Sequence, residues 1–509
     1  MEKVNTSLTL SHYAASKARR AVKRSDDVKS VGFGCGATAI IAALILFASF
    51  DMSTYTFSIG MVIVSAVFFV EAAVLLLVRN ILKAELSKKY DLSRKTRFWA
   101  IPLILFICTG NIFSFIAGMT LIKKNKNLEY QIGVYMFLID IVVILVSSIN
   151  IFKGYIMSTF IPAITALVLI ALVHLVMTLL LASLVKGNCA DKKVLPVIIV
   201  LVLSAFTGNI LALLLAGIAF KKYLNKDPDV AANWVDIIKR LFRSNTAALG
   251  LMFVIVLLML SIWANYTFDY SVAVENNYSN ILQGPSLMYP LGTDDFGRCV
   301  FTRIIFGAKI SLISSVCTVS ITAVVGVTLG AIAGYYSGIA EVVIMRVMDV
   351  LLATPGLLLP IAVVSSLGTS LPCIIVAIAI TPIPAYARTI RASIITTKGA
   401  EFVQAAKACG AKNSSIIVKH LLPNGIAPLI VRMTMSLGAN VLCLSSLSYL
   451  GVGVDSYIPE WGSILKTGSE YLEAASWLAI FPGIMIILLV LSFNFLGDGL
   501  RDALDPKLK

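Results

Sequence analysis

Runs of about 20 apolar residues recur along the chain, and each is long enough to cross the hydrocarbon core of a bilayer as a helix. The 509 residues are 58% hydrophobic and only 14% charged, and the mean hydropathy is +0.91. Lipid offers no partner for free backbone groups, so crossing segments at this density must be α-helices. Because the runs are apolar on both faces, a transmembrane β-barrel is excluded. The sequence therefore predicts an all-α, polytopic membrane protein.

The apolar runs number about 12 and form two groups of six, separated by a charged stretch at 225–246. That stretch places apolar residues at helical spacing beside lysine and arginine, as a helix on the membrane surface does. We expect a basic tail (1–30), a first membrane domain (31–224), the connector (225–246) and a second membrane domain (247–509). The expected spans are 31–50, 56–78, 98–122, 132–152, 158–185 and 194–220 in the first domain, and 247–264, 309–334, 342–366, 372–390, 425–450 and 477–498 in the second.

The net charge of +15 is spread over short loops and is not gathered on one domain. This distribution is typical of the positive-inside rule and of contact with anionic lipid, and it argues against nucleic-acid binding. The basic loop 391–424 and both ends of the chain are therefore expected in the cytoplasm, and the loop 265–305 outside. The eight cysteines show no spacing suited to a metal or a disulfide, and several lie inside apolar runs.

A weak internal repeat lies in the first domain: TGNIFSFIAGMTLIKK at 109–124 resembles TGNILALLLAGIAFKK at 207–222. A duplication of three helices explains it, and three true spans per copy would invert the second copy. The lysine clusters at 123–127 and 186–193 would then lie outside. If the TGNI segments re-enter the membrane without crossing it, every lysine cluster lies inside. Six ordinary spans remain the expectation.

Three ionisable side chains lie within the expected spans of the first domain, namely Glu71, Asp140 and His174. An ionisable group inside a membrane indicates a functional site by default. The alternative is hydrogen bonding between neighbouring helices. We favour that alternative, because no second carboxylate is placed to form a proton relay with Asp140.

A polar stretch, EFVQAAKACGAKNSSIIVKHLLPN (401–424), interrupts the apolar pattern of the second domain. Its first part is rich in good helix formers, and Gly410 is suited to end that helix. Asn413 or Ser414 is suited to cap a second helix, and Pro423 is expected to stop it before the next span. Small residues expose little side chain, so this helix-turn-helix is either a close docking surface for another protein or an ordinary solvated loop.

The stretch resembles the coupling motif of ATP-binding-cassette importer permeases, written EAA, three residues, G, nine residues, I, any residue, LP. The matching positions are Ala405, Ala406, Gly410, Leu422 and Pro423. Gln404 stands where glutamate is usual, and His420 stands where isoleucine is usual. Glu401 lies one helical turn earlier and is placed to supply charge to the same surface.

Six further motifs resemble the second permease subunit of dipeptide, oligopeptide and nickel importers, over about residues 235–509. They are PLGTDDFGRCVFTRIIFGAKISL, GVTLGAIAGYYSG, IMRVMDVLLATPGLLLPI, YARTIRASI, SYLGVGVDSYIPEWGSIL and FNFLGDGLRDALDPKLK. The resemblance implies a six-span permease core with no enzymatic activity and no cofactor of its own. It also implies several partners: a homologous second permease, two cytoplasmic ATPase subunits that hold ATP and Mg, an extracellular solute-binding protein, and a peptide substrate. The chain contains no GxxxxGK[ST] phosphate loop, in keeping with ATP hydrolysis on a partner.

The resemblance also covers an external loop signature, GTDDFGR, with Gly292, Asp294, Asp295, Gly297 and Arg298. We expect these residues to form an N-capped turn that opens a helix, and not to touch substrate.

Other residues of the second domain are expected to shape its helices. Gly326, Gly330 and Gly334 recur every four residues, which permits close helix packing. Arg346 and Asp349 are expected to pair within one helix. Five prolines are expected to kink or bound the spans: Pro355, Pro360, Pro372, Pro382 and Pro384.

Two other classes of protein remain as alternatives. A secondary transporter or channel needs ion-binding carboxylates at mid-membrane depth, and 309–498 offers almost none. A membrane enzyme needs paired carboxylates, a metal cluster or a nucleophile with its base, and three histidines give little material. Within the importer family, a nickel or metal-chelate substrate is the alternative to peptides, although histidine and cysteine are sparse along the expected pathway. The first 225 residues resemble no family that we recognise and are expected to form an accessory membrane domain.

Overall fold

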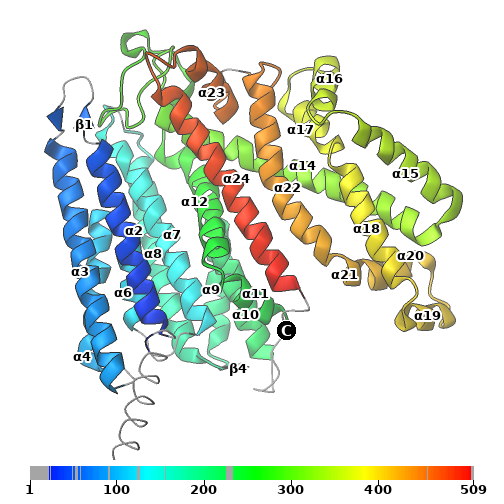
Figure 1. The fold of residues 1–509 in the computed structure, drawn as a ribbon, viewed down its shortest axis with the longest axis horizontal. Coiled ribbons are helices and arrows are strands. Elements are labelled where there is room, and N and C mark those ends of the chain that lie inside the picture. Colours follow the sequence, from blue (N-terminus) through cyan, green and yellow to red (C-terminus); the bar gives the residue numbers. More distant parts are fainter. Residues whose placement is uncertain are drawn as a thin grey trace, which may run out of the picture. The chain divides into compact units, whose positions relative to one another are not determined.

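The computed structural model describes residues 22, 25–48, 50–51, 56–57, 59–89, 92–122, 127–154, 156–187, 189–224, 233–455 and 457–505. The described residues are almost all helical (Figure 1), which confirms the predicted all-α class. Among them, eight helices are long and apolar enough to cross a membrane, and two bent pairs raise the number to 10 at most. The helices form two compact units, residues 1–138 with 175–183 and residues 139–174 with 184–509.

The first unit is built around two long helices, α2 and α3, which pack along each other through buried aliphatic residues such as Val31, Leu75 and Leu82. Nearly all of the predicted basic tail before α2 lies outside the described residues. The elements are α2 (Asp26–Ala48), β1 (Phe50–Asp51), β2 (Thr56–Phe57), α3 (Ile59–Lys89), α4 (Arg94–Arg97), α5 (Ala100–Leu105), η1 (Phe106–Thr109), α6 (Ile112–Ile122) and the first part of α7 (Leu128–Ser148).

The first TGNI segment folds back on itself. Helices α5 and α6 lie side by side, and a Cβ added at Gly118 would come within 2.9 Å of the Ala100 carbonyl oxygen. The guanidinium of Arg97, which precedes α5, donates to the Leu121 carbonyl at the end of α6 (Nη1–O 2.9 Å). Because its two ends lie together, this segment is a re-entrant hairpin.

The second TGNI segment has the same construction. Helices α9 and α10 pack along each other, and the Lys222 amine near the end of α10 donates to the Gly187 carbonyl that precedes α9 (Nζ–O 2.8 Å). The elements of this part are η2 (Ile149–Phe152), α8 (Phe160–Leu184), β3 (Val185–Lys186), β4 (Cys189–Ala190), α9 (Val194–Ser204), η3 (Ala205–Thr207) and α10 (Ile210–Leu224).

The two hairpins correct the expectation of six ordinary spans in the first domain. Each copy of the repeat consists of two long helices followed by one re-entrant hairpin. Two crossings per copy, unlike three, require no inversion of the second copy. Counted in this way, the basic loops that follow α3 and precede α9 fall on one side of the membrane, as the positive-inside rule predicts.

The second domain has a long apolar helix at four of the six predicted crossings (α12, α14, α22 and α24) and a bent pair of helices at each of the other two. The α15–α16 pair bends by 94° beside Pro355, and the α17–α18 pair bends by 45° at Pro382. The elements are α11 (Asn233–Leu241), α12 (Asn245–Thr267), α13 (Ser271–Val274), η4 (Tyr278–Asn280), α14 (Val300–Tyr336), α15 (Gly338–Ala353), α16 (Leu358–Leu367), α17 (Leu371–Ile380), α18 (Ile383–Thr397), α19 (Glu401–Ala408), α20 (Asn413–Ile416), η5 (Ile417–Leu421), α21 (Leu422–Gly425), α22 (Ala427–Tyr449), α23 (Trp461–Glu470) and α24 (Trp477–Leu504).

The other three prolines do not kink a helix. Pro372 and Pro384 stand in the first turns of α17 and α18, where the missing N–H costs no hydrogen bond. Pro360 is likewise near the start of its helix, α16, and is buried there.

The glycine row of α14 brings this helix against α18. A Cβ at Gly326 would lie 2.6 Å from the Cβ of Tyr386, and a Cβ at Gly330 would lie 2.4 Å from the carbonyl oxygen of Ala387. Gly334 makes the same kind of contact one turn further on, against the backbone of Arg391. The predicted role in close helix packing is confirmed.

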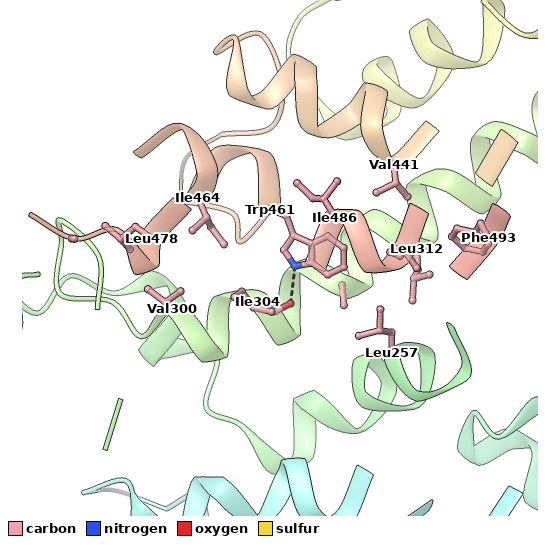
Figure 2. Close-up of a cluster of buried hydrophobic side chains, with 13 residues drawn as sticks. Leu257, Val300, Ile304, Leu312, Val441, Trp461, Ile464, Leu478, Ile486 and Phe493 are labelled. Carbon is pink, nitrogen blue, oxygen red and sulfur yellow. Dashed lines mark hydrogen bonds between the residues drawn. The ribbon is translucent and has the colours of Figure 1, made fainter. Parts of the chain in front are cut away.

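The core of the second domain is centred on Trp461 of α23. Figure 2 shows its indole ring among apolar side chains of α12, α14, α22 and α24, where it has no exposed surface. The indole Nε1 donates to the carbonyl oxygen of Ile304 in α14, at 2.9 Å. One side chain therefore ties the start of α23 to the first half of α14.

The connector helix α11, expected at the membrane surface, packs against α24. Leu241 at its end and Phe242 just after it are buried. A Cβ at Gly499 of α24 would lie 3.0 Å from the Leu241 Cδ1 atom. The apolar face of the connector therefore covers the last turns of α24. Residues 225–232 lie outside the described part.

Candidate coupling surface and external loop

The polar stretch folds as a short helix, a glycine turn and a second helical segment. Helix α19 ends where predicted, and Gly410 follows it with a φ of +77°, a left-handed conformation that glycine adopts without strain. The N–H groups of Gly410 and Ala411 donate to the carbonyls of Lys407 (2.9 Å) and Ala406 (3.1 Å). These bonds satisfy the free carbonyl groups at the helix end, as in a Schellman motif.

Two details of the second segment differ from the prediction. Helix α20 begins at Asn413, but Lys412 is its N-cap and makes no side-chain capping bond. Asn413 instead accepts a hydrogen bond from the Tyr335 hydroxyl at the end of α14 (2.7 Å). Pro423 does not stop the helix, because a π-helical turn (η5) precedes it and the proline lies in the first turn of α21. A proline in a first turn needs no N–H partner.

Buried apolar residues fix this loop to the membrane helices. Val403, Ile416 and Leu421 have no exposed surface and pack with Tyr335 and Ile390, from α14 and α18. The amine of Lys398 donates to the carbonyl of Tyr335, and that of Lys407 lies 5.7 Å from the Tyr335 ring centre. The sequence prediction missed Tyr335, which is the residue that most of these contacts share.

The opposite side of α19 is exposed and includes small residues. Glu401, Gln404, Ala405 and Gly410 are exposed, and a Cβ at Gly410 would meet no atom within 4 Å. The Gln404 amide donates to the Gly399 carbonyl (3.2 Å). Figure 1 shows α19 at the tip of the loop, beyond the ends of α18 and α21. Of the other predicted residues, Pro423 is exposed and three are half-buried: Ala406, His420 and Leu422.

The external loop signature forms a tight turn held by Asp294. Its carboxylate accepts from the N–H groups of Phe296 (3.0 Å) and Arg298 (2.8 Å) and from the Arg298 guanidinium (Oδ2–Nε 2.7 Å). Asp294 thus caps the turn that leads into the helix, as expected. Helix α14 itself begins at Val300, with Cys299 as N-cap and no side-chain capping bond.

Both glycines of the signature are required, because other atoms lie where a side chain would begin. A Cβ at Gly297 would lie 1.8 Å from the Asn277 carbonyl oxygen, and one at Gly292 would lie 2.5 Å from the indole nitrogen of Trp477. Both residues also have positive φ angles. The signature therefore folds the external loop onto itself and onto the start of α24, and no larger residue fits at either position.

Asp294 and Asp295 are expected to differ in their contribution to stability. Asp294 is buried and takes three hydrogen bonds, so Asp294→Asn should lower the free energy of unfolding by about 3 kcal/mol, as breaking a buried ion pair does. Asp295 lies 3.8 Å from Arg298. Burial, followed by the charge of Asp294, raises the pKa of Asp295 above its usual value.

Because the pKa is raised in the folded chain, stability falls as the pH rises from the ordinary aspartate pKa to the raised one, and the full cost applies above it. Asp295→Asn should therefore leave the purified protein at least as stable at neutral pH, with the difference vanishing in acid. Thermal unfolding of both variants across this pH range is the measurement. Equal destabilisation by the two changes at neutral pH would contradict the assigned geometry.

The expected ion pair within α15 has a closer partner on another helix. Arg346 and Asp349 are 3.8 Å apart, but the Arg388 guanidinium of α18 lies 2.6 Å from the Asp349 carboxylate. Next to it, Arg391 of α18 donates to Glu341 of α15 (Nε–Oε1 2.7 Å). The charges of α15 thus join it to α18.

Comparison with known proteins covers the second domain. Residues 326–509 match the family described as binding-protein-dependent transport system inner membrane component, and residues 233–285 match the N-terminal TM domain of oligopeptide transport permease C. The dipeptide transport system permease protein DppC of Alkalihalophilus pseudofirmus is 44% identical over 276 residues, which are 54% of this chain and 90% of that protein. The glutathione transport system permease protein GsiD of Pectobacterium atrosepticum is 40% identical over 284 residues, 56% of this chain and 94% of that protein.

The long apolar helices, the anchored loop and these matches define a multi-pass transport subunit and not an enzyme. The chain belongs to the family of binding-protein-dependent transport system inner membrane components, as an ABC importer permease of the dipeptide and oligopeptide type. Both family models begin at or after residue 233, so the first domain is an addition to the part that these models describe.

Proposed function

We propose that this chain forms half of the translocation pathway of an ATP-driven peptide importer and receives its driving force through the 401–423 loop. The observation that carries the proposal is the two-sided construction of α19. One side is fixed to α14 and α18 by buried Val403, and the other offers small exposed residues around Ala405 and Gly410. A helix of this shape is suited to the groove of a partner protein.

The partners follow from this role. A homologous second permease completes the pathway, two cytoplasmic ATPase subunits bind ATP and Mg, and an extracellular solute-binding protein delivers the substrate. Closure of the ATPases moves α19, and α19 moves the helices that hold it. The state of the ATPase thereby biases which side of the pathway is open. In this arrangement the 391–424 loop and both chain ends face the cytoplasm, and the external loop faces the binding protein.

Peptides are the proposed substrate class, and a nickel or metal chelate is the alternative. Support comes from the relatives, which are named as dipeptide and glutathione transport permeases. The test is uptake by cells that contain the complete importer, measured with a labelled dipeptide and with ⁶³Ni. ATP-dependent uptake of the metal alone would replace the peptide assignment and leave the permease assignment intact.

Glu401 is proposed to supply the charge that Gln404 does not carry. Glu401 is exposed in the first turn of α19, so Glu401→Gln should weaken ATPase binding roughly threefold, and more at low salt, as expected for a charge at the rim of an interface. Gln404→Ala is the matched control, because it removes a neutral group of the same helix. The measurement is ATPase binding to purified permease at two salt concentrations. Equal effects of the two changes would remove Glu401 from the account.

A further inference from the structure

The two re-entrant hairpins end in tips of the same sequence and the same shape. In each, a 3-10 turn ends at threonine, and a glycine with positive φ follows, Gly110 at +84° and Gly208 at +97°. The next residue is a buried asparagine, Asn111 or Asn209. The duplicated TGN sequence is therefore a duplicated structural element and not a chance similarity.

In the first copy, the asparagine fastens the tip to both long helices. The Asn111 amide donates to Glu71 of α3 (Nδ2–Oε2 2.6 Å) and to Thr38 of α2 (Nδ2–Oγ1 3.1 Å). The Thr109 hydroxyl donates to the other carboxylate oxygen of Glu71 at 2.5 Å. The interhelical role expected for this carboxylate is confirmed.

In the second copy, the corresponding positions carry the same kind of contact. The Asn209 amide donates to Asp140 of α7 (Nδ2–Oδ1 2.9 Å), and Asp140 also lies 2.6 Å from the His174 ring of α8 (Oδ2–Nδ1). All three residues have no exposed surface. Each tip is thus held to the two long helices of its own copy, which fixes the direction in which its backbone points.

The second tip is a docking surface for a membrane helix. The Thr207 carbonyl accepts from the indole nitrogen of Trp263 in α12, the first helix of the permease domain (3.0 Å). A Cβ at Gly208 would lie 2.7 Å from Ile262 Cδ1 and 3.3 Å from Met259 Cα, so only glycine allows this approach. Small residues and hydrogen bonds of this kind hold helices together in lipid, where no hydrophobic force acts between them.

The first tip has the same backbone shape but is exposed. Thr109 and Gly110 are both exposed, and a Cβ at Gly110 would meet no atom within 4 Å. By contrast, Gly208 is buried under α12. The duplicated element therefore has one covered and one exposed docking surface.

We propose that the exposed tip at Thr109–Gly110 docks a transmembrane helix of the second permease subunit. This inference rests on the proposed function, which supplies that subunit as a homologue of the permease domain. The second tip shows what such a surface binds: the first helix of a permease domain, with a side-chain donor that faces the threonine carbonyl. A homologous permease brings a helix of the same kind. Residues 26–224 are then an adaptor with one dock for its own permease domain and one for the partner.

The test places a photo-cross-linking amino acid at Leu105, which is 60% exposed and precedes the tip by one turn. The matched control is Phe98, which is 70% exposed and lies at the opposite end of the same arm of the hairpin. The full chain is expressed with the second permease and the ATPases, irradiated in membranes and purified. The expected result is a covalent product with the second permease from position 105 and not from position 98.

Gly110→Leu in the same experiment should lower the cross-linked fraction about tenfold, the loss expected for one close helix contact in lipid. Equal products from both positions, or lipid adducts alone while the second permease co-purifies, would overturn the docking proposal and leave the importer assignment standing. If the second permease does not co-purify with the unaltered chain, the proposed function fails and this inference fails with it.

Discussion

Replacing Gly410 by leucine is expected to reduce ATP-driven uptake by an order of magnitude or more while the chain still inserts and folds. The residue has a φ of +77°, where a side chain costs about 1–2 kcal/mol. That local cost is small for a domain with an extensive core. The larger effect is steric, because the new side chain projects from the surface that we assign to the ATPase and meets no atom of its own chain within 4 Å.

The measurement is uptake and ATPase co-purification for the variant and two controls. Gly368→Leu introduces the same side chain at another open position with positive φ (+97°), between α16 and α17. Gly410→Asn keeps a residue that tolerates this conformation and is smaller than leucine. Both controls should retain most of the uptake. Full uptake and normal assembly in Gly410→Leu would place the ATPase contact elsewhere.

Replacing Trp461 by alanine is expected to have the largest effect on stability, a loss of about 3–5 kcal/mol in the free energy of unfolding. The indole is fully buried among four membrane helices, so its removal leaves a large cavity in the core. Its hydrogen bond to the Ile304 carbonyl is lost as well, and that carbonyl is buried. The measurement is the unfolding midpoint of the purified protein in detergent.

Trp461→Phe separates the two contributions. It keeps most of the apolar volume and removes the hydrogen bond, so its cost should be about 1–2 kcal/mol. If the alanine and phenylalanine variants were equally destabilised, the packing role assigned to Trp461 in α23 would be wrong.

The fold of the second domain follows closely from its sequence, and the reason is physical. Its long apolar runs form helices, because only internal hydrogen bonding satisfies the backbone in lipid. The bends at Pro355 and Pro382 were also predictable, because proline removes a backbone donor wherever it stands inside a span. The end of α19 at Gly410 follows in the same way from the preference of glycine for positive φ.

The hairpins of the first domain could not be predicted from hydropathy. The segments 98–122 and 194–220 are as apolar as true spans, and hydropathy counts length without showing direction. The signal was present in TGN, where a glycine is followed by an asparagine that needs a partner in lipid. The partners, Glu71 and Asp140, lie far away in sequence, so only the structure brings them to the tips.

The coupling loop was also predicted only in part from its sequence. The motif placed Ala405, Ala406 and Gly410 on the docking surface. The structure exposes Ala405 and Gly410, whereas Ala406 is half-buried and packs on the cluster that holds the loop. Asn413 was expected to cap a helix but bonds to Tyr335 of α14. That contact depends on how the loop lies against α14, which local sequence does not determine.

The central claim is that this chain is the permease of an importer driven by ATP. Its most direct test is reconstitution of the chain with its second permease and ATPases in proteoliposomes, with the binding protein and labelled dipeptide outside and ATP inside. The account predicts accumulation that requires hydrolysable ATP and is lost in the Gly410→Leu variant. Accumulation without ATP, driven by an ion gradient and unchanged in that variant, would contradict it.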